Sequence, residues 1–522
     1  MVDTKKEQER DELHRAIWAI ADELRGAVDG WDFKNYVLGT MFYRYISENL
    51  CNYINSGEID AGNTDFDFAK MPDEDAEEAR EGLVEEKGFF ILPSELFCNV
   101  RANAANDENL NETLERVFRH IEESAEGSEA ESDFAGLFDD YDVNSNKLGS
   151  TVAKRNEKLV KLLNGVGEMN LGDVKDHSID AFGDAYEYLM TMYASNAGKS
   201  GGEFFTPADV SELLTRLGTV GKTEINKVYD PACGSGSLLL KAEKILGKDA
   251  IRNGFYGQEI NITTYNLCRI NMFLHDVGFD KFDIACEDTL LSPQHWDDEP
   301  FELIVSNPPY SIKWAGDENP LLINDPRFAP AGVLAPKSKA DMAFIMHSLS
   351  WLASYGTAAI VCFPGIMYRG GAEQKIRKYL VDNNYIDCII QLPSNLFFGT
   401  SIATCIMVMK KNKADNKTLF IDATSECVKV TNNNKLTPEN IDCIVDVFAK
   451  REEVEHFAHL ASYEEVSNND YNLSVSTYVE AEDTRERIDI VKLNAEIKEI
   501  VAREQVLRDE IDKIIAEIEV GA

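Results

Sequence analysis

The stretch that decides the fold of this chain is KVYDPACGSGS, residues 227–237. Its first four residues predict a short buried strand, and the apolar spacing of 237–246 predicts a helix. Gly234 and Gly236 allow a tight turn between them and let a ligand approach the backbone where a Cβ atom would clash. The stretch has no G-x-G-x-x-G pattern and no Lys-Ser/Thr pair, so a polyphosphate is not its obvious ligand. Taken alone, the glycines are equally compatible with a plain strand–helix connection.

Short apolar runs alternate with helical segments around this stretch, from about residue 170 to 475. We expect strands at 227–230, 254–260, 282–288, 301–307, 357–363, 385–392 and 403–410. We expect helices at 237–246, 262–276, 341–354 and 371–383. Such alternation predicts an α/β fold with a largely parallel sheet covered by helices on both faces. Ligands of these sheets bind beyond the carboxyl ends of the strands.

Two carboxylates close the strands that follow the glycine turn. Glu259 ends the strand in YGQEI, where α/β nucleotide sites place a carboxylate that accepts both hydrogen bonds of a ribose diol. Asp288 ends the next strand and can accept a hydrogen bond from an exocyclic amine such as that of adenine. Each carboxylate considered alone is more often simply solvated.

The sequence Asn307-Pro308-Pro309-Tyr310 closes the fourth strand. The Asn307 side-chain oxygen and the Pro308 carbonyl can each accept one N–H of an amino group conjugated to a π-system. Pro309 has no N–H and stiffens the loop, while Tyr310 offers a flat face for stacking. Holding both hydrogens frees the nitrogen lone pair to attack an electrophilic methyl group, which requires positioning more than a metal or a strong base. The simpler alternative is that the two prolines only end the strand.

In this order, DPACGSGS, YGQEI, CED and NPPY resemble the motifs of S-adenosylmethionine-dependent methyltransferases that act on adenine N6 in DNA, in the γ arrangement. GEFFTP (202–207) is similar to the motif that closes over the methionine end of the cofactor. The resemblance is closer still to the modification (M) subunit of type I restriction–modification systems, because it extends to FKNYVLGTMFYRYIS (33–47), LPSNLFFGTSIATCIMVMKK (392–411) and the C-terminal helical tail. It implies a Rossmann-like core with a seven-stranded, mostly parallel sheet.

The resemblance also implies roles for individual residues. The cofactor-binding residues would be Glu203, Phe204, Phe205, Thr206, Pro207, Ala208, Asp230, Pro231, Ala232, Cys233, Gly234, Ser235, Gly236, Glu259 and Asp288. The catalytic residues would be Asn307, Pro308, Pro309 and Tyr310, which would hold a target adenine that has left the DNA stack. Cys233 is not expected to act as a nucleophile, because N-methylation needs no thiol.

The chain is expected to have three parts. Residues 1–165 are predicted to form a helical domain, since Leu13, Ile17 and Ile20 keep helical spacing. Residues 166–478 form the expected catalytic domain. Within the tail, 479–522, apolar residues recur at alternating steps of three and four, which indicates a coiled-coil or partner-binding helix, although packing on its own domain would give the same pattern.

The chain is strongly acidic, with 92 Asp and Glu against 52 Lys and Arg and a net charge of −40. Such a surface repels phosphate, so the chain alone should hold DNA poorly. The resemblance explains this charge, because M subunits work with a specificity (S) subunit that reads the DNA sequence, usually as two M per S, and with a restriction (R) subunit in the full complex. Double-stranded DNA would then be bound through the complex.

The remaining composition points to a cytoplasmic protein without a metal. The ten cysteines include no C-x-x-C pair and no Cys/His cluster at zinc spacing. The first residues, MVDTKKEQERDEL, have no apolar core of a secretory signal, and no run approaches the length of a membrane span.

Four alternatives are weaker. A self-sufficient adenine methyltransferase would need a basic recognition region, which is not evident in 1–165 or 412–480. A glutamine N5-methyltransferase acting on protein also uses NPPY, but GEFFTP and the heptad tail argue against it. An N4-cytosine methyltransferase would more often have Ser at position 307, and a catalytically dead scaffold would not need Asn307, Tyr310 and both glycines.

Overall fold

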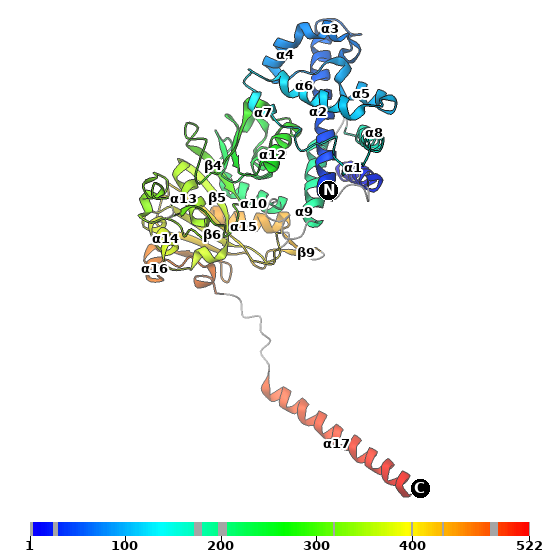
Figure 1. The fold of residues 1–522 in the computed structure, drawn as a ribbon. Helices are drawn as coiled ribbons and strands as arrows, with labels where there is room; N and C mark the ends of the chain where they lie inside the picture. The colour runs from blue at the N-terminus through cyan, green and yellow to red at the C-terminus, as the bar shows by residue number, and fades with distance from the viewer. Residues whose placement is uncertain are drawn as a thin grey trace. The chain divides into compact units, whose positions relative to one another are not determined.

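The computed structural model describes residues 4–24, 30–171, 180–196, 206–316, 319–397, 400–430, 433–480 and 489–520. The chain divides into two compact units, Met1–Val479 and Glu480–Ala522, and each is described by itself. Figure 1 shows the fold of the first unit, with its central sheet in green and yellow and its first helices in blue and cyan.

A nine-stranded sheet organises the first unit, in the order β11-β8-β6-β7-β5-β4-β1-β2-β3. The strands are β1 (Val228–Asp230), β2 (Phe255–Glu259), β3 (Phe282–Cys286), β4 (Phe301–Ser306), β5 (Leu352–Cys362), β6 (Ile386–Gln391), β7 (Cys405–Lys410), β8 (Thr418–Asp422) and β11 (Ala458–Ala461). The five adjacent strands β5, β4, β1, β2 and β3 are parallel to one another, whereas β7 is antiparallel to both β5 and β6. A separate hairpin pairs β9 (Val428–Val430) with β10 (Asn433–Lys435).

The α/β fold class is confirmed, and all seven expected strands are present within a few residues of their expected bounds. The sheet is wider than the expected seven strands, because β8 pairs in parallel with β6 and β11 pairs antiparallel with β8. The expected helix 341–354 ends at Trp351, since Leu352 already begins β5 and pairs with Phe301.

Helices cover the two faces of the sheet. On one face lie α10 (Ala208–Thr219), α11 (Ser237–Leu246), α12 (Ile262–Leu274) and α15 (Pro438–Lys450). The other face packs against α13 (Asp341–Trp351), α14 (Ala372–Asp382) and the neighbouring α16 (Tyr463–Asn468). Each face has its own apolar core, one containing Val228 and Leu303 and the other containing Tyr229, Ile304 and Trp351.

The N-terminal region is helical, as expected. It comprises α1 (Thr4–Leu24), α2 (Gly30–Asp60), α3 (Asp73–Ala76), α4 (Arg80–Lys87), α5 (Phe97–Asn103), α6 (Leu110–Ser124), α7 (Glu131–Phe134) and α8 (Val152–Glu168), followed by α9 (Ala181–Asn196). The apolar side chains of α1 and α2 share one continuous core with α9, α12 and the first face of the sheet. This shared core ties the helical region to the strands that carry the motifs.

In the second unit, the described residues form one helix, α17 (Ile490–Val520). Its apolar residues Leu493, Ile497, Ile500, Leu507, Ile511, Ile514 and Ile518 follow the three–four spacing of one seam, in which Glu504 occupies the position between Ile500 and Leu507. A single helix cannot bury such a seam on itself. Among the described residues, no helix has the combination of length and low charge needed to cross a membrane.

The entry into β2 generates a first prediction. Gly254 has a φ of +87°, and a Cβ atom added there would lie 2.0 Å from the carbonyl oxygen of Lys281. We therefore expect Gly254→Ala to lower the free energy of unfolding by about 2 kcal/mol or more, from backbone strain together with this clash. The measurement is urea unfolding followed by tryptophan fluorescence.

Gly221→Ala is the matched control for this prediction. Gly221 has a similar φ of +77°, but a Cβ atom there would meet nothing within 4 Å. The control should therefore cost only the strain of the left-handed backbone, about 1 kcal/mol. Equal losses in the two variants would contradict the proposed clash of the added Cβ atom with the Lys281 carbonyl.

Candidate active site

The glycine turn connects β1 to α11 beyond the carboxyl end of the sheet. Gly236 precedes α11 with a φ of +78°, and a Cβ atom there would lie 2.7 Å from the Cys268 sulfur. This position therefore requires glycine for both conformation and packing. Cys233 is buried in the same turn, 4.0 Å from the Cys268 sulfur, and this contact and its burial raise the pKa of the Cys233 thiol. The thiol stays protonated and is not poised as a nucleophile.

Asp230 ends β1 with its carboxylate fully buried. One carboxylate oxygen accepts hydrogen bonds from the Ala232 backbone N–H (2.9 Å) and the Ser306 hydroxyl (2.6 Å). The other oxygen is buried without a hydrogen-bond partner. Burial raises the pKa of Asp230 to about 7, and the two donors only partly offset this effect. A buried acceptor with no partner is costly unless a ligand supplies a donor.

Glu259 ends β2 and reaches the glycine turn from the neighbouring strand. Its carboxylate accepts hydrogen bonds from the backbone N–H of Gly234 (3.1 Å) and of Asn261 (2.8 Å), one on each oxygen. The side chain is largely buried, and this burial raises its pKa. Each oxygen keeps a further lone pair, so the carboxylate can still accept two hydrogen bonds from a diol.

Asp288 follows β3 at the start of the loop that leads to β4. Its carboxylate accepts a hydrogen bond from the Leu290 N–H at 2.9 Å, which folds the chain back beside the glycine turn. The Thr289 hydroxyl donates to the carbonyl oxygen of Pro231 at 2.6 Å. The loop after β3 is thus joined directly to the turn after β1.

A buried arginine holds this loop through hydrogen bonds to its backbone. Arg327 is 1% exposed and donates hydrogen bonds to the carbonyl oxygens of Thr289 and Leu290, both at 2.8 Å. It also donates to Nδ1 of His347 at 3.1 Å, so the other ring nitrogen carries the hydrogen and faces the Tyr229 hydroxyl at 2.8 Å. Burial and the adjacent guanidinium keep the pKa of His347 well below its usual value, so the imidazole is neutral.

The Asn307 side chain lies between two partners at the end of β4. Its amide nitrogen donates to the Thr206 hydroxyl at 3.1 Å, and its oxygen accepts from the Tyr310 hydroxyl at 2.5 Å. Burial raises the pKa of Tyr310, so its hydroxyl remains a donor. These contacts orient the amide and leave its oxygen one lone pair for a further donor.

These residues surround one cavity of about 390 Å³, a size typical of small-molecule sites. Of the residues expected at the site, those lining the cavity are Thr206, Asp230, Pro231, Ala232, Cys233, Gly234, Ser235, Glu259, Asp288, Asn307 and Pro309. Pro207, Ala208, Gly236, Pro308 and Tyr310 belong to the same segments without lining it. Glu203, Phe204 and Phe205 lie outside the described residues.

Several lining residues had no role assigned from the sequence. They are Ser237, Leu238, Gln258, Ile260, Asn261, Thr289, Leu290, Ile312, Lys313, Trp314 and Phe344. Ser237, Gln258 and Ile260 lie inside the quoted motifs, and most of the others directly continue a motif along the chain. Arg327, His347 and Phe344 carry no such signal, because their positions depend on the tertiary fold.

The N-6 DNA methylase family matches residues 177–487, and the HsdM N-terminal domain matches residues 13–166. The chain is 50% identical to the type I restriction enzyme MpnII methylase subunit of Mycoplasma pneumoniae, over 99% of this chain and 98% of that protein. The chain belongs to the N-6 DNA methylases, among the methylase subunits of type I restriction enzymes. Its family and fold are those of a DNA methyltransferase, and they imply the use of S-adenosylmethionine.

Solved structures agree with this assignment of the methylase subunit. The type I restriction–modification system methyltransferase subunit of Streptococcus thermophilus is 35% identical, with a TM-score of 0.81 over 90% of this chain and 100% of that one. A chain from a structure on complex assembly and conformational transition of the type I system has a TM-score of 0.64 at 18% identity, covering 97% of this chain and 99% of that one. The second match shows the shared fold alone.

Asp230 provides a pH-dependent prediction. The pKa of Asp230 is about 7 in the folded state, whereas the same carboxyl group in the unfolded chain loses its proton near pH 4. The free energy of unfolding therefore falls as the pH rises from about 4 to about 7, and it stays lower above pH 7. Asn cannot ionise, so Asp230→Asn should raise the thermal midpoint relative to the natural protein more at about pH 8 than at about pH 5. The measurement is thermal unfolding of the ligand-free methylase subunit at both pH values.

Asp422→Asn is the matched control, because Asp422 ends β8 near the surface and accepts the same kinds of hydrogen bond from Thr424. Asp422 is only partly buried, so Asp422→Asn should not give the gain at about pH 8 that is expected for Asp230→Asn. If Asp230→Asn changes the thermal midpoint equally at both pH values, burial does not raise the pKa of Asp230.

Proposed function

We propose that this methylase subunit transfers a methyl group from S-adenosylmethionine to N6 of an adenine in DNA, with the residues at the strand ends as its active site. The observation that carries the proposal is the placement of Asn307 on the same cavity as the buried carboxylates of Asp230 and Glu259. The two carboxylates can hold a cofactor, and Asn307 can hold an amino group beside it.

The described residues fit S-adenosylmethionine. The buried oxygen of Asp230 without a partner calls for a donor, and the Glu259 carboxylate can accept from a ribose diol. Asp288 lines the same cavity and can accept from an adenine amine, while Leu238, Ile260 and Leu290 supply apolar walls. When bound, S-adenosylmethionine supplies an electrophilic methyl group.

The target loop would act by positioning an amine. The Asn307 oxygen and the Pro308 carbonyl would each accept one N–H of the adenine amino group, which keeps the nitrogen lone pair from delocalising into the ring. Thr206 and Tyr310 fix the Asn307 amide in advance, at 3.1 and 2.5 Å, so little freedom is lost on binding. The target base must leave the duplex stack to reach this loop.

Partner subunits explain the acidity of the chain. With a net charge of −40, the methylase subunit is poorly suited to hold DNA alone. We propose that an S subunit supplies sequence recognition, usually to two methylase subunits, that an R subunit joins the full complex, and that DNA is bound through this assembly in the cytoplasm. In this view 1–165, 166–478 and 479–522 are the helical, catalytic and partner-binding parts, and α17 contacts the S subunit.

Asn307→Ala tests the active-site assignment. Asn307 is one of the two proposed acceptors for the adenine amino group. Removing it should reduce the rate of methyl transfer by about 100-fold or more, because the nitrogen on which charge develops in the transition state loses a stabilising hydrogen bond. Cofactor binding, measured by calorimetry, should change little. The rate is measured as labelled methyl incorporated into unmodified DNA by the complex with its S subunit.

Asn383→Ala, which removes the same side chain from the exposed end of α14, is the control and should leave the rate unchanged. If Asn307→Ala methylates adenine at the normal rate, Asn307 does not hold the target amine.

Substitutions in α17 test the partner assignment. Ile511→Glu combined with Ile514→Glu places charges on the apolar seam, so the variant should no longer copurify with the S subunit while its cofactor affinity is retained. Lys513→Glu adds negative charge to the same helix beside the seam and should still copurify.

We also expect adenine methylation only with the S subunit. Sequence-specific methylation by the chain alone would rule out the proposal that the S subunit supplies sequence recognition.

A further inference from the structure

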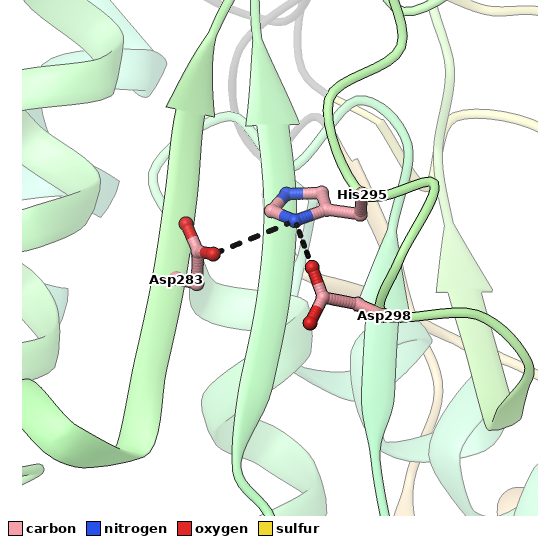
Figure 2. Close-up of side chains that lie close together, drawn as sticks. All are labelled: Asp283, His295 and Asp298. Carbon is pink, nitrogen blue, oxygen red and sulfur yellow. Dashed lines mark hydrogen bonds and ion pairs between the residues drawn. The ribbon is translucent and has the colours of Figure 1, made fainter.

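One histidine and two aspartates converge at a place that the proposed active site does not use. Asp283 lies in β3, and His295 and Asp298 lie in the loop that leads from β3 to β4. None of the three lines the active-site cavity. Figure 2 shows their side chains turned toward one another, with both dashed lines ending on the same ring nitrogen of His295.

The orientation of the His295 ring is set by its surroundings. Its Nε2 atom lies 2.9 Å from the carbonyl oxygen of Gly257, which can only accept, so Nε2 carries the hydrogen. The side chain is 2% exposed and packs edge-to-face against Tyr256, with ring centroids 5.6 Å apart. The other nitrogen, Nδ1, is therefore aimed at the two carboxylates. A histidine oriented through a backbone carbonyl is the usual arrangement for a metal ligand.

The distances among the three donor atoms suit a shared ion. Nδ1 lies 3.3 Å from an Asp298 carboxylate oxygen and 3.7 Å from one of Asp283, and the three atoms lie within 4.8 Å of one another. Ligand atoms about 2.1 Å from one metal ion lie about 3 to 4 Å apart. The Asp283 side chain is 59% exposed, so it can rotate to close the set. The imidazole lies on the buried side of the site, and the two carboxylates lie on the side that faces solvent.

We propose that Asp283, His295 and Asp298 bind one divalent first-row transition-metal ion, with water completing its coordination. One imidazole nitrogen and two carboxylate oxygens suit Mn²⁺ or Zn²⁺ rather than a soft ion that prefers sulfur. The two negative charges of the carboxylates match the charge of the ion. The sequence led us to expect no metal, because the cysteines and histidines lack zinc spacing; here the fold, rather than a short motif, brings the ligands together.

The ion would brace a loop that reaches the active site. The loop from β3 to β4 starts with Asp288, Thr289 and Leu290, which line the cavity, and continues to His295 and Asp298. Arg327 fastens its first part through backbone carbonyls, and the ion would fasten its last part to β3. Bound metal is therefore expected to raise the thermal midpoint, because it binds only the folded arrangement.

Mn²⁺ titration of the full-length methylase subunit, followed by electron paramagnetic resonance of the free ion, tests this proposal. Mn²⁺ is preferred to Zn²⁺ as the probe because thiolates bind Mn²⁺ weakly, and Cys98 and Cys443 are exposed. The natural protein should show one site that is tighter than its general acidic surface. Asp283→Asn and Asp298→Asn should each lower the affinity of that site on the order of tenfold or more.

Asp297→Asn is the matched control, since Asp297 is an exposed aspartate of the same loop that lies outside the cluster. It should keep both the tight site and the rise of the thermal midpoint with Mn²⁺, and Asp283→Asn should lose both. Equal Mn²⁺ affinity in Asp283→Asn and Asp297→Asn would overturn the proposal. So would the absence of a tight site in the natural protein.

Discussion

The parallel pairing of β3, β2, β1 and β4 is the constraint on which the site depends. Because these four strands run in the same direction and lie side by side, their carboxyl ends meet at one edge of the sheet. Residues as far apart in sequence as Asp230 and Ser306 then form a hydrogen bond of 2.6 Å. The helices and both apolar cores keep this edge in place, and the last residues of the strands together with the loops that follow them carry the chemistry.

The site is built at a cost in stability. Asp230 is fully buried, one of its oxygens has no partner, and its pKa is raised to about 7. Such a group opposes folding when it is ionised, and the apolar packing around the sheet must compensate. The same low-polarity surroundings make each hydrogen bond to a ligand stronger than it would be in water. Strain of this kind is typical of functional sites rather than of structural ones.

The sequence predicted the strand ends well, because each motif combines an apolar run with an unusual polar or glycine-containing turn. The residues beneath the site were not predictable in this way. Arg327 acts through the backbone carbonyls of Thr289 and Leu290, and any residue type supplies such carbonyls, so no pattern marks the contact. His295 likewise acquires its orientation from the Gly257 carbonyl. The two additional strands of the sheet, β8 and β11, were not predicted; neither ends in a motif of the kind that marks β1, β2 and β4. The roles assigned to Glu203, Phe204 and Phe205 remain predictions, since these residues lie outside those described.

The antiparallel strand β7 has a consequence for how the chain assembles during synthesis. In the described sheet, β6 pairs with β7 and β8, and both of these strands follow it in sequence. When β6 leaves the ribosome, neither of the strands with which it pairs in the folded sheet has yet been made. Only after β7 has been made and inserted beside β5 can the second half of the sheet join the first. Until then β6, whose residues Ile389 and Ile390 are buried in the folded sheet, has no native strand to pair with and is open to wrong pairing.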